Sequence, residues 1–225
     1  MHLFEKISVV CQHAITLPKR KQSIKKYLYD HHIKKLHLGC GTTILPSWLN
    51  SDLFGNNKRI FLDAAKRFPF PNNTFDYVFS EHLIEHLTYT KGMSMLQECF
   101  RVLKKGGKIR VATPDLSFLI FLHQPKKSEL QQRYIKWATN AFIPSAPSAD
   151  DAFVINNFFR AWGHRFIYDK KILQQSLQTA GFTSVTTCKP SISSDPVLCS
   201  LEQHGHLIGN AFNLLETMVL EGKKR

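Results

Sequence analysis

Several features that would identify other classes of protein are missing from this chain. Its five cysteines form no C-x-x-C pair and no metal-like cluster, and their odd number favours a reduced protein over a disulfide framework. No apolar run approaches the roughly 18 residues that a membrane-spanning helix needs. Glu5 and Lys6 interrupt the first apolar stretch, and the main basic cluster follows it, which is not the pattern of a signal peptide. We therefore expect a cytoplasmic protein.

Acidic residues are also scarce, because 17 Asp and Glu stand against 30 Lys and Arg and leave a net charge of +13. Such an excess suits a phosphorylated or otherwise anionic small molecule, a membrane surface or, less favoured, a nucleic acid. A solvated basic surface is the simpler explanation of this charge and is favoured over these partners. The hydrophobic content of 43% is that of a globular protein, and 225 residues are enough for one large core, so we expect a single domain.

The basic charge is concentrated near the amino terminus. Apolar residues at helical spacing over residues 3–17 predict an amphipathic helix that Pro18 ends. Lysines then surround a second amphipathic stretch, so residues 1–34 form a basic helical extension. Such a helix can make peripheral contact with anionic lipid or with a phosphate backbone. The simpler alternative is a helix that covers the edge of the sheet and turns its lysines to water.

Short apolar strands alternate with helical segments from residue 35 onward, which predicts an open, mostly parallel α/β sheet. The predicted strands are residues 35–38, 48–53, 59–62, 75–80, 108–112, 182–188 and 217–220, and the predicted helices are residues 91–103 and 169–180. Gly106 and Gly107 are expected to end the first of these helices as a C-cap. Only about ten residues separate Gly41 from Asp52, so the first crossover helix must be very short or absent.

The alternation fails between residues 113 and 167. This stretch is rich in aromatic residues and has a loop-like centre at residues 144–151. An insertion after the carboxyl end of a strand lies over the ligand crevice, so it predicts a lid or substrate platform; a helical cover on the core is the alternative. The expected division is therefore a cofactor-binding half at 35–112, a lid insertion at 113–167 and a carboxyl-terminal half at 168–225.

Two glycines, Gly39 and Gly41, follow the first strand directly. Backbone without side chains at the end of a buried strand allows a nucleotide-like ligand to approach closely. The third glycine of the dinucleotide fingerprint is missing, as is the G-K-[ST] ending of a phosphate-binding loop. Asp52 and Asp63 follow the next two strands, where they could meet ribose hydroxyls and an adenine amino group. This combination disfavours ATP and nicotinamide dinucleotides.

These motifs together resemble class I S-adenosylmethionine-dependent methyltransferases, and most of all small bacterial members of the methyltransferase type 11 group. Five segments carry the resemblance: residues 36–41 (LHLGCG), 48–52 (WLNSD), 68–76 (FPFPNNTFD), 81–87 (EHLIEHL) and 98–107 (ECFRVLKKGG). It covers residues 35–112 and, more loosely, residues 163–188. The short first crossover and the missing third glycine depart from the family pattern.

The resemblance implies a Rossmann-like, mostly parallel seven-stranded sheet of order 3-2-1-4-5-7-6, with an antiparallel last strand and helices on both faces. It also implies S-adenosylmethionine as the cofactor. The residues implied to bind it are the glycine segment for the methionine and ribose portion, the two acids with their neighbours for ribose and adenine, and the end of the fourth strand for the methionine end: Gly39, Cys40, Gly41, Asp52, Leu53, Asp63, Ala64, Ser80 and Glu81.

Methyl transfer from a sulfonium requires alignment, exclusion of water and, for some acceptors, removal of a proton, but no metal. His82 and His164 are the candidate bases, followed by Tyr168, His204 and His206. Asp115 is a further pocket candidate, or simply a helix cap. The letters HLIEH at residues 82–86 also match the inverted zinc-peptidase motif, which is the weaker interpretation because the segment follows a strand and no third acidic ligand stands out.

The acceptor is less defined than the cofactor. No Asn-Pro-Pro-Tyr-like motif follows the fourth strand, and no catalytic Pro-Cys pair is present, which disfavours nucleobase or protein amide acceptors. Small-molecule, glycan or lipid-linked acceptors remain, and the basic surface suits a phosphorylated one. The alternative function is a catalytically inactive cofactor-, RNA- or membrane-binding module on the same fold.

Overall fold

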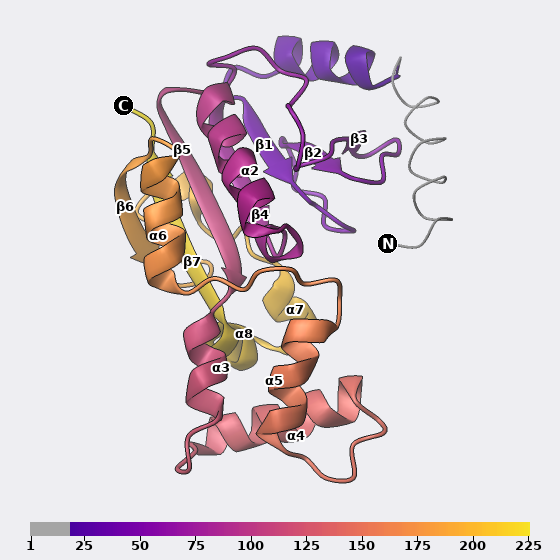
Figure 1. Cartoon of the computed structure of the whole chain (residues 1–225). Coiled ribbons are helices and arrows are strands. Elements are labelled where there is room, and N and C mark those ends of the chain that lie inside the picture. Colours follow the sequence, from indigo (N-terminus) through magenta and orange to yellow (C-terminus); the bar gives the residue numbers. More distant parts are fainter. Residues whose placement is uncertain (1–18) are drawn as a thin grey trace.

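The structure is a computed structural model that describes residues 19–225, so the helix predicted over residues 3–17 lies outside the described residues. Seven strands form one sheet of order β3-β2-β1-β4-β5-β7-β6 (Figure 1). β7 is antiparallel to both of its neighbours, and the other pairs are parallel, so the predicted order and directions are confirmed. The strands are β1 (Lys35–Leu38), β2 (Leu49–Asp52), β3 (Ile60–Phe61), β4 (Phe75–Glu81), β5 (Leu103–Pro114), β6 (Thr183–Cys188) and β7 (Thr217–Lys223).

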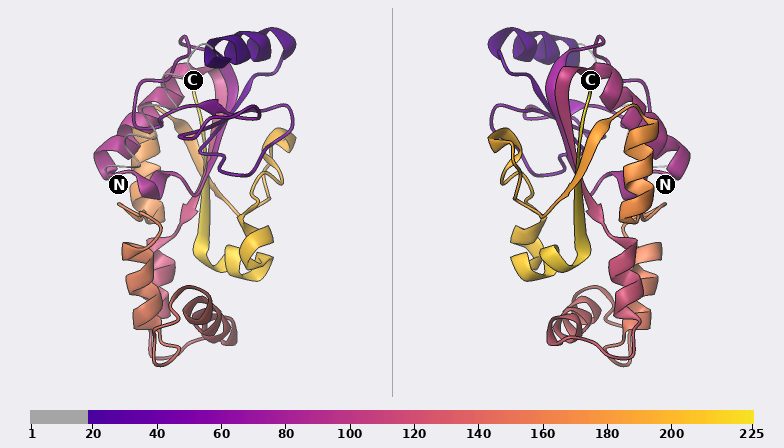
Figure 2. Two further views of the ribbon diagram at one scale, coloured as in Figure 1. Left: turned by 90° about the vertical axis from the view of Figure 1, so that its right-hand side faces the viewer. Right: turned by 90° about the vertical axis from the view of Figure 1, so that its left-hand side faces the viewer.

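The two faces of the sheet are covered differently. Helices α2 (Tyr89–Val102) and α6 (Lys170–Thr179) lie on one face, on the opposite side of the sheet from the chain that leads into α7 (His204–Ile208) (Figure 2). On that second face, Phe79 packs against Leu198 of the short 3-10 helix η2 (Pro196–Leu198) and against Trp48. Residues 41–48 contain no helix, which confirms that the first crossover lacks one. Side chains from this loop and from η2 fill the space instead.

The predicted C-cap at Gly106 and Gly107 is wrong. Helix α2 ends at Val102, and β5 begins at the next residue and continues through both glycines. Gly106 has a φ of +79°, and a Cβ on Gly107 would lie 3.0 Å from the Asp76 carbonyl oxygen. The glycines therefore serve a tight irregularity of the β4–β5 ladder, where its register shifts between Phe75 and Tyr77.

Residues 113–167 form a helical lobe beyond the carboxyl ends of the strands (Figure 1). Its helices are α3 (Leu116–Leu122), α4 (Glu129–Phe142) and α5 (Asp151–Arg160), and α8 (Asn210–Glu216) packs beside them. Each helix of the lobe begins with a side chain that accepts a backbone N–H: Asp115, Ser128 and Asp150. Asp115 is thus a helix cap, as its alternative interpretation predicted. The lobe has its own core, centred on Phe118, Tyr134 and Phe158, apart from the main core between the sheet and helices α2 and α6.

Residues 19–30 form a helix that turns Ile24 and Tyr27 into the main core and leaves Lys25 and Lys26 exposed. The Arg20 guanidinium donates to the carbonyl oxygen of Phe61 in the edge strand β3 at 3.4 Å. This arrangement agrees with the simpler expectation, a helix against the sheet edge with its lysines in water. Within residues 19–225, no helix combines the length and the apolar character that crossing a bilayer requires.

Candidate active site

A cleft of about 700 Å³ lies at the carboxyl end of β1, a size within the range of about 300–1,000 Å³ that small-molecule sites occupy. One wall is the glycine turn with the loop behind it, and the opposite wall is the segment that leads into α7. Of the residues predicted to bind the cofactor, four line this cleft: Gly39, Cys40, Gly41 and Glu81. The opposite wall includes Ser200, Gln203, His204, His206 and Leu207. Of that wall, the sequence had indicated only His204 and His206, as candidate bases.

The glycine turn is shaped for close approach of a ligand. Gly39 and Gly41 have φ values of +62° and +50°, a backbone region that residues other than glycine rarely adopt. A Cβ on Gly39 would lie 2.7 Å from Leu83 Cδ1, whereas a Cβ on Gly41 would meet nothing within 4 Å. The cleft beside Gly41 is therefore open because the residue is glycine. Bare backbone of this kind fits a nucleoside cofactor.

Asp52 holds this turn to the end of β2. Its Oδ2 accepts the Gly41 N–H at 2.9 Å, and its Oδ1 accepts the Phe54 N–H at 3.0 Å. Asp63 makes a similar local turn at the end of β3, where its Oδ1 accepts the Ala65 N–H at 2.9 Å. Five of the predicted cofactor residues do not line the cleft itself, and their cofactor contacts stay predictions: Asp52, Leu53, Asp63, Ala64 and Ser80.

Glu81, at the end of β4, fixes the opposite wall in place. Its carboxylate accepts the backbone N–H of Gln203 at 2.9 and 3.1 Å and that of His204 at 3.0 Å. A carboxylate at the start of α7 is well placed to accept these otherwise unpaired donors. Through this contact the position of His204 depends on β4, the strand that pairs with β1 beside the glycine turn.

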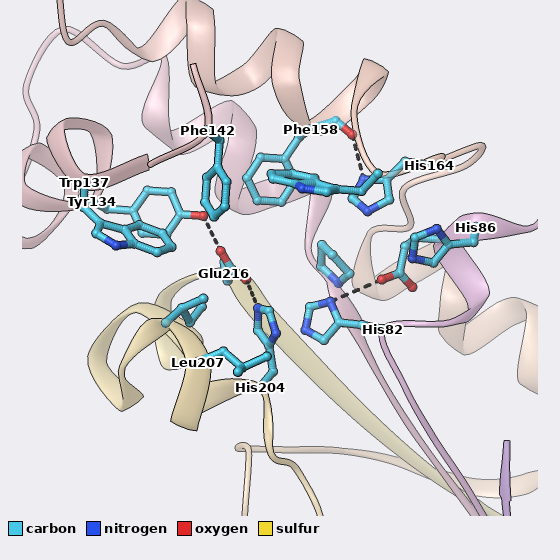
Figure 3. A pocket seen from close by; sticks show the side chains of 14 residues that line it. His82, His86, Tyr134, Trp137, Phe142, Phe158, His164, His204, Leu207 and Glu216 are labelled. Atoms are coloured by element: carbon cyan, nitrogen blue, oxygen red, sulfur yellow. Dashed lines mark hydrogen bonds and ion pairs between the residues drawn. The ribbon is translucent and has the colours of Figure 1, made fainter. Parts of the chain in front are cut away.

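A second cavity, of about 410 Å³, opens between the sheet and the helical lobe (Figure 3). It shares His82, His204 and Leu207 with the cleft, so the two spaces meet at these side chains. We call this cavity the aromatic chamber. Five of its lining side chains are aromatic rings from α4, α5 and the loop after α5: Tyr134, Trp137, Phe142, Phe158 and Trp162. The lobe therefore provides a substrate-sized space beside the cleft.

Two histidine–carboxylate pairs lie where the chamber meets the cleft. His82 Nδ1 is 3.2 Å from Glu85 Oε1, and His204 Nε2 is 2.9 Å from Glu216 Oε1. Burial alone would lower the pKa of His82, but the ion pair with Glu85 and the nearby Glu216 outweigh it and raise that pKa. Glu85 is fully buried and also accepts the Thr113 hydroxyl at 2.9 Å.

His164 faces the chamber in a different electrostatic state. Its Nδ1 bonds the Phe158 carbonyl oxygen at 2.7 Å, which leaves Nε2 as the free ring nitrogen. Burial lowers the pKa of His164, and the neighbouring His86 and His82 lower it further against the opposing effect of Glu85. The ring is therefore neutral near pH 7, as a proton acceptor must be.

The remaining candidates separate clearly. Tyr168 is fully buried in the main core, where burial raises the pKa of its hydroxyl, and it lines neither space. His206 lines the cleft from α7. The sequence did not single out Glu216 or Glu85 for these pairs. The only available signals were positional: Glu216 directly precedes a strand, and Glu85 lies inside the HLIEH motif.

The HLIEH motif does not form the helical zinc site of a peptidase. His82 has a φ of +46° and precedes the short 3-10 helix η1 (Ile84–His86), so the two histidines do not share a helical face. His82 turns to Glu85 and towards His204, with ring centroids 3.9 Å apart, whereas His86 packs edge-on against His164 at 5.0 Å. The two histidines that the motif would place at one zinc ion therefore have different partners.

The open position at Gly41 gives a direct test of the cleft. We expect Gly41→Ala to cost roughly 1 kcal/mol of stability, because alanine is strained in left-handed backbone. It should also raise the dissociation constant for S-adenosylmethionine about tenfold, which corresponds to roughly 1.4 kcal/mol. Gly106→Ala is the matched control, because Gly106 also has positive φ and open space but lies outside the cleft. Calorimetry and urea unfolding of both variants would distinguish the two effects; equal affinities would contradict the assignment.

Comparison with known proteins agrees with this architecture. Residues 53–111 match the model of a methyltransferase domain family. A search of the curated proteins finds no match. Among solved structures, a SAM-dependent methyltransferase from Archaeoglobus fulgidus is 16% identical over 91% of this chain and 92% of that chain, with a TM-score of 0.50. Another, from Mesorhizobium loti, is 13% identical over 85% of this chain and 91% of that chain, and its TM-score is also 0.50.

The phosphoethanolamine N-methyltransferase 2 of Haemonchus contortus is also similar, at 14% identity over 85% of this chain and a TM-score of 0.46. The chain spans 48% of the length of that protein. These similarities concern the fold. The strand order is that of Rossmann-like methyltransferases, and the family match over residues 53–111 supports a class I S-adenosylmethionine-dependent methyltransferase domain.

Proposed function

We propose that the protein transfers a methyl group from S-adenosylmethionine in the cleft to a small acceptor in the aromatic chamber. The observation that supports this most directly is the contact between the two spaces at His82, His204 and Leu207. A donor on one side and an acceptor on the other would meet at one point, and such alignment is the main requirement of the reaction. When bound, the cofactor supplies a methyl group on a sulfonium, and it leaves as a neutral thioether.

The chain's own residues would position the reactants and exclude water. Gly39 and Gly41 would admit the cofactor, and the wall held by Glu81 would cover it. Tyr134, Trp137 and Phe158 would surround the acceptor with apolar surface, so that little water competes for the methyl group. Where the acceptor carries a proton, Nε2 of His164 would take it, since this ring is neutral and its other nitrogen is already bonded to Phe158.

The lining of the chamber favours an acceptor with an apolar or aromatic body that is uncharged or cationic. The chain has a net charge of +13, yet none of the residues described as lining the chamber is Lys or Arg. Its charged and titratable members are Glu85, Glu216 and four histidines. Buried carboxylates repel a phosphate, whereas aromatic rings attract an amine or quaternary cation. The basic outer surface, which suggested a phosphorylated acceptor, does not extend into this chamber.

An acceptor panel tests the proposal. Tyramine, phenethylamine and catechol would be offered with labelled S-adenosylmethionine, each beside an anionic analogue of similar size such as phosphotyramine or phenylacetate. We expect label to be transferred to at least one amine or phenol and to none of the anionic analogues. Calorimetric binding of the cofactor without turnover of any acceptor would instead favour the inactive module. Equal turnover of the phosphorylated analogues would contradict the acceptor class.

His164→Gln is expected to lower kcat/KM for a proton-bearing acceptor by about 10²–10⁴-fold, the usual contribution of a general base. The affinity for S-adenosylmethionine should not change, because His164 does not line the cleft. Because the pKa of His164 is lowered, the acidic limb of the wild-type rate profile should fall below the ordinary value of 6.5, and it should be lost in the variant. His123→Gln, at an exposed histidine outside the chamber, is the control. A wild-type limb above pH 6.5 would contradict this role.

A further inference from the structure

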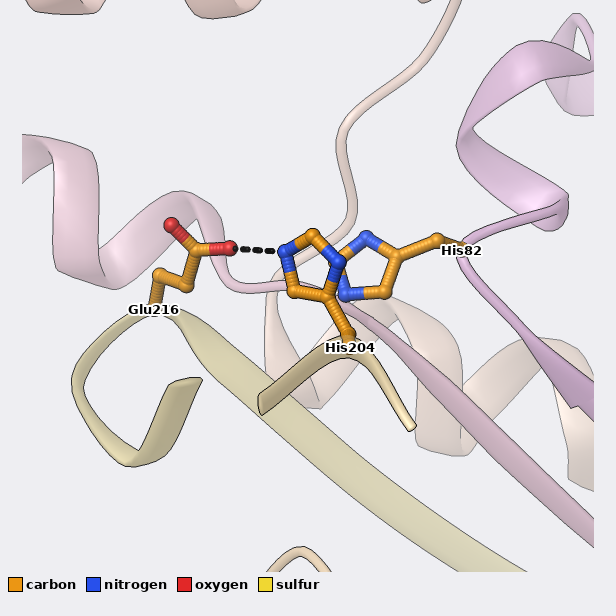
Figure 4. Close-up of side chains that lie close together, drawn as sticks. All are labelled: His82, His204 and Glu216. Carbon is orange, nitrogen blue, oxygen red and sulfur yellow. Dashed lines mark hydrogen bonds and ion pairs between the residues drawn. The ribbon is translucent and has the colours of Figure 1, made fainter. Parts of the chain in front are cut away.

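We propose that His82, His204 and Glu216 bind one divalent transition-metal ion where the cleft meets the aromatic chamber (Figure 4). Each residue offers one ligand atom, and the three atoms lie within 4.8 Å of one another. Two imidazole nitrogens with one carboxylate oxygen are donors that suit zinc, iron, cobalt or nickel better than magnesium or calcium. With only three protein ligands, such an ion keeps positions for other groups.

The three ligands come from separate parts of the chain, and each is fixed by its element. His82 follows β4, His204 begins α7, and Glu216 ends α8 directly before β7. His204 Nε2 and Glu216 Oε1 are 2.9 Å apart. Neighbouring ligands of one ion with bonds of about 2.1 Å are roughly 3.0 Å apart in an octahedral site and roughly 3.4 Å apart in a tetrahedral one, so a small separation of the two atoms would admit the ion. A modest rotation of the His82 ring would complete the set, since its ring centroid is 3.9 Å from that of His204.

A second layer of contacts orients these ligands as it does in metal sites. His82 Nδ1 pairs with the buried Glu85 at 3.2 Å, which directs Nε2 towards the proposed ion. The hydroxyl of Thr217 lies 3.4 Å from that Nε2 but donates its own proton to Asn213 Oδ1 at 2.8 Å. It therefore gives no proton to the Nε2 lone pair of a neutral His82.

Glu216 is oriented in the same way. Its Oε2 accepts the hydroxyl of Tyr134, which leaves Oε1 for the site. The backbone of His204 is held by Glu81. Each of the three ligands thus has one dedicated partner outside the site. Together with Glu81 and Glu85, the carboxylate of Glu216 surrounds the position with negative charge, which attracts a cation.

A second group, Glu85 with His86 and His164, also has ligand atoms within 4.8 Å. It fits an ion less well, because Glu85 already bonds Thr113 and pairs with His82, and His86 is the most exposed of the three. At the site with Glu216, the ligand atoms bond no group outside the site strongly, and the ion would replace the proton that His204 Nε2 and Glu216 Oε1 share. An ion there would face the chamber as a Lewis acid for an oxygen or nitrogen atom of the acceptor. That role rests on the proposed function, whereas the existence of the site does not.

The experiment is a titration of chelator-treated full-length protein with Co²⁺, followed by its visible d–d absorption, and with Zn²⁺ by calorimetry. We expect one ion per chain. His204→Ala and Glu216→Gln should each weaken binding at least 100-fold, and Glu85→Gln should weaken it about 10–100-fold as a change of second layer does. His206→Ala, two residues from His204 in the same short helix, should leave the affinity unchanged.

Thermal unfolding of each variant checks that it is folded. If His204→Ala does not fold, His204→Gln replaces it in the titration. No cobalt spectrum with wild-type protein, or an equal loss in His206→Ala, would overturn the site. Strong weakening by His164→Ala together with none by His204→Ala would also overturn it, because the ion would then lie at the second group. S-adenosylmethionine affinity, measured on the same samples, keeps the two proposals apart: cofactor binding without metal binding would overturn only this one.

Discussion

Arg110→Ala is expected to destabilise the protein by about 3–5 kcal/mol, the usual loss when one partner of a buried ion pair is removed. Arg110 is fully buried in β5 and donates at 2.5 Å both to Glu202 and to Glu221 of the neighbouring strand. It also donates to the carbonyl oxygens of Ile192 at 3.0 Å and Lys189 at 3.2 Å. Alanine would leave two carboxylates in the interior without their cation. Urea unfolding at pH 7 would measure the loss.

Lys108→Ala is the matched control for this variant. Lys108 lies on the same strand as Arg110. It pairs at 2.8 Å with Asp195, which belongs to residues 189–202 that Arg110 also contacts, but its side chain is 33% exposed. Partly solvated pairs contribute about 0–1 kcal/mol, so the loss should be several times smaller. If Arg110→Ala lowers the free energy of unfolding no more than Lys108→Ala does, the guanidinium does not hold residues 189–202 in place. Arg110→Met combined with Glu202→Leu and Glu221→Leu should recover most of the stability, since apolar replacements remove the buried charges altogether.

The sheet was predictable because its signals are local. Each strand of the amino-terminal half is a short apolar run, and the glycines and acids that follow β1, β2 and β3 occur at the carboxyl ends where ligands bind in such sheets. The absence of a first crossover helix followed from the spacing of Gly41 and Asp52 alone. The misplaced helix end at Gly106 has the same origin. Glycine after a helical run predicts a C-cap from local sequence, but pairing of β5 with β4 determined the actual structure.

The second wall of the cleft could not be predicted, because contacts distant in sequence create it. The segment that precedes α7 has no strong periodicity, and its position depends on Arg110 and on Glu81. The resemblance implied a contact of Glu81 with the methionine end of the cofactor, but nothing in the sequence indicated that its carboxylate holds Gln203 and His204. The partner of His204 is Glu216, and the two are brought together by the turn between α7 and α8. Sequence spacing carries no record of such pairs.

His82 illustrates the limit from the opposite direction. As a zinc-peptidase motif, HLIEH would place His82 and His86 on one helical face, whereas for methyl transfer His82 was a candidate base. In the structure, left-handed backbone at His82 sends its side chain towards His204 while η1 sends His86 to His164. Backbone of this kind at a residue other than glycine is held only by its surroundings, and it concentrates at functional sites. His82 therefore stays a candidate, and its partners depend on a local conformation that the sequence does not indicate.

Asp52→Ala is expected to weaken binding of S-adenosylmethionine on the order of 100-fold, or about 2.7 kcal/mol. The carboxylate accepts two backbone N–H groups, from Gly41 at 2.9 Å and Phe54 at 3.0 Å, and hydrogen bonds to a charged acceptor are worth about 1.5–3 kcal/mol each. Without the first of them, the glycine turn loses its attachment to β2. If the carboxylate also accepts the ribose hydroxyls, as the resemblance implies, that interaction is lost as well. Calorimetry with the cofactor and with its demethylated product would measure the change.

Asp169→Ala separates this effect from a general loss of stability. Asp169 Oδ1 accepts the Ile172 N–H at 2.7 Å at the start of α6, outside the cleft, so its removal should cost about 1 kcal/mol of stability and leave cofactor affinity unchanged. Asp52→Asn distinguishes the two contributions of Asp52, because the amide retains one acceptor oxygen but carries no charge. An affinity between those of wild type and Asp52→Ala would agree with a turn held by two hydrogen bonds. An unchanged affinity in Asp52→Ala would show that neither the turn nor the ribose depends on this carboxylate, and the cofactor would then have to be held from the opposite wall.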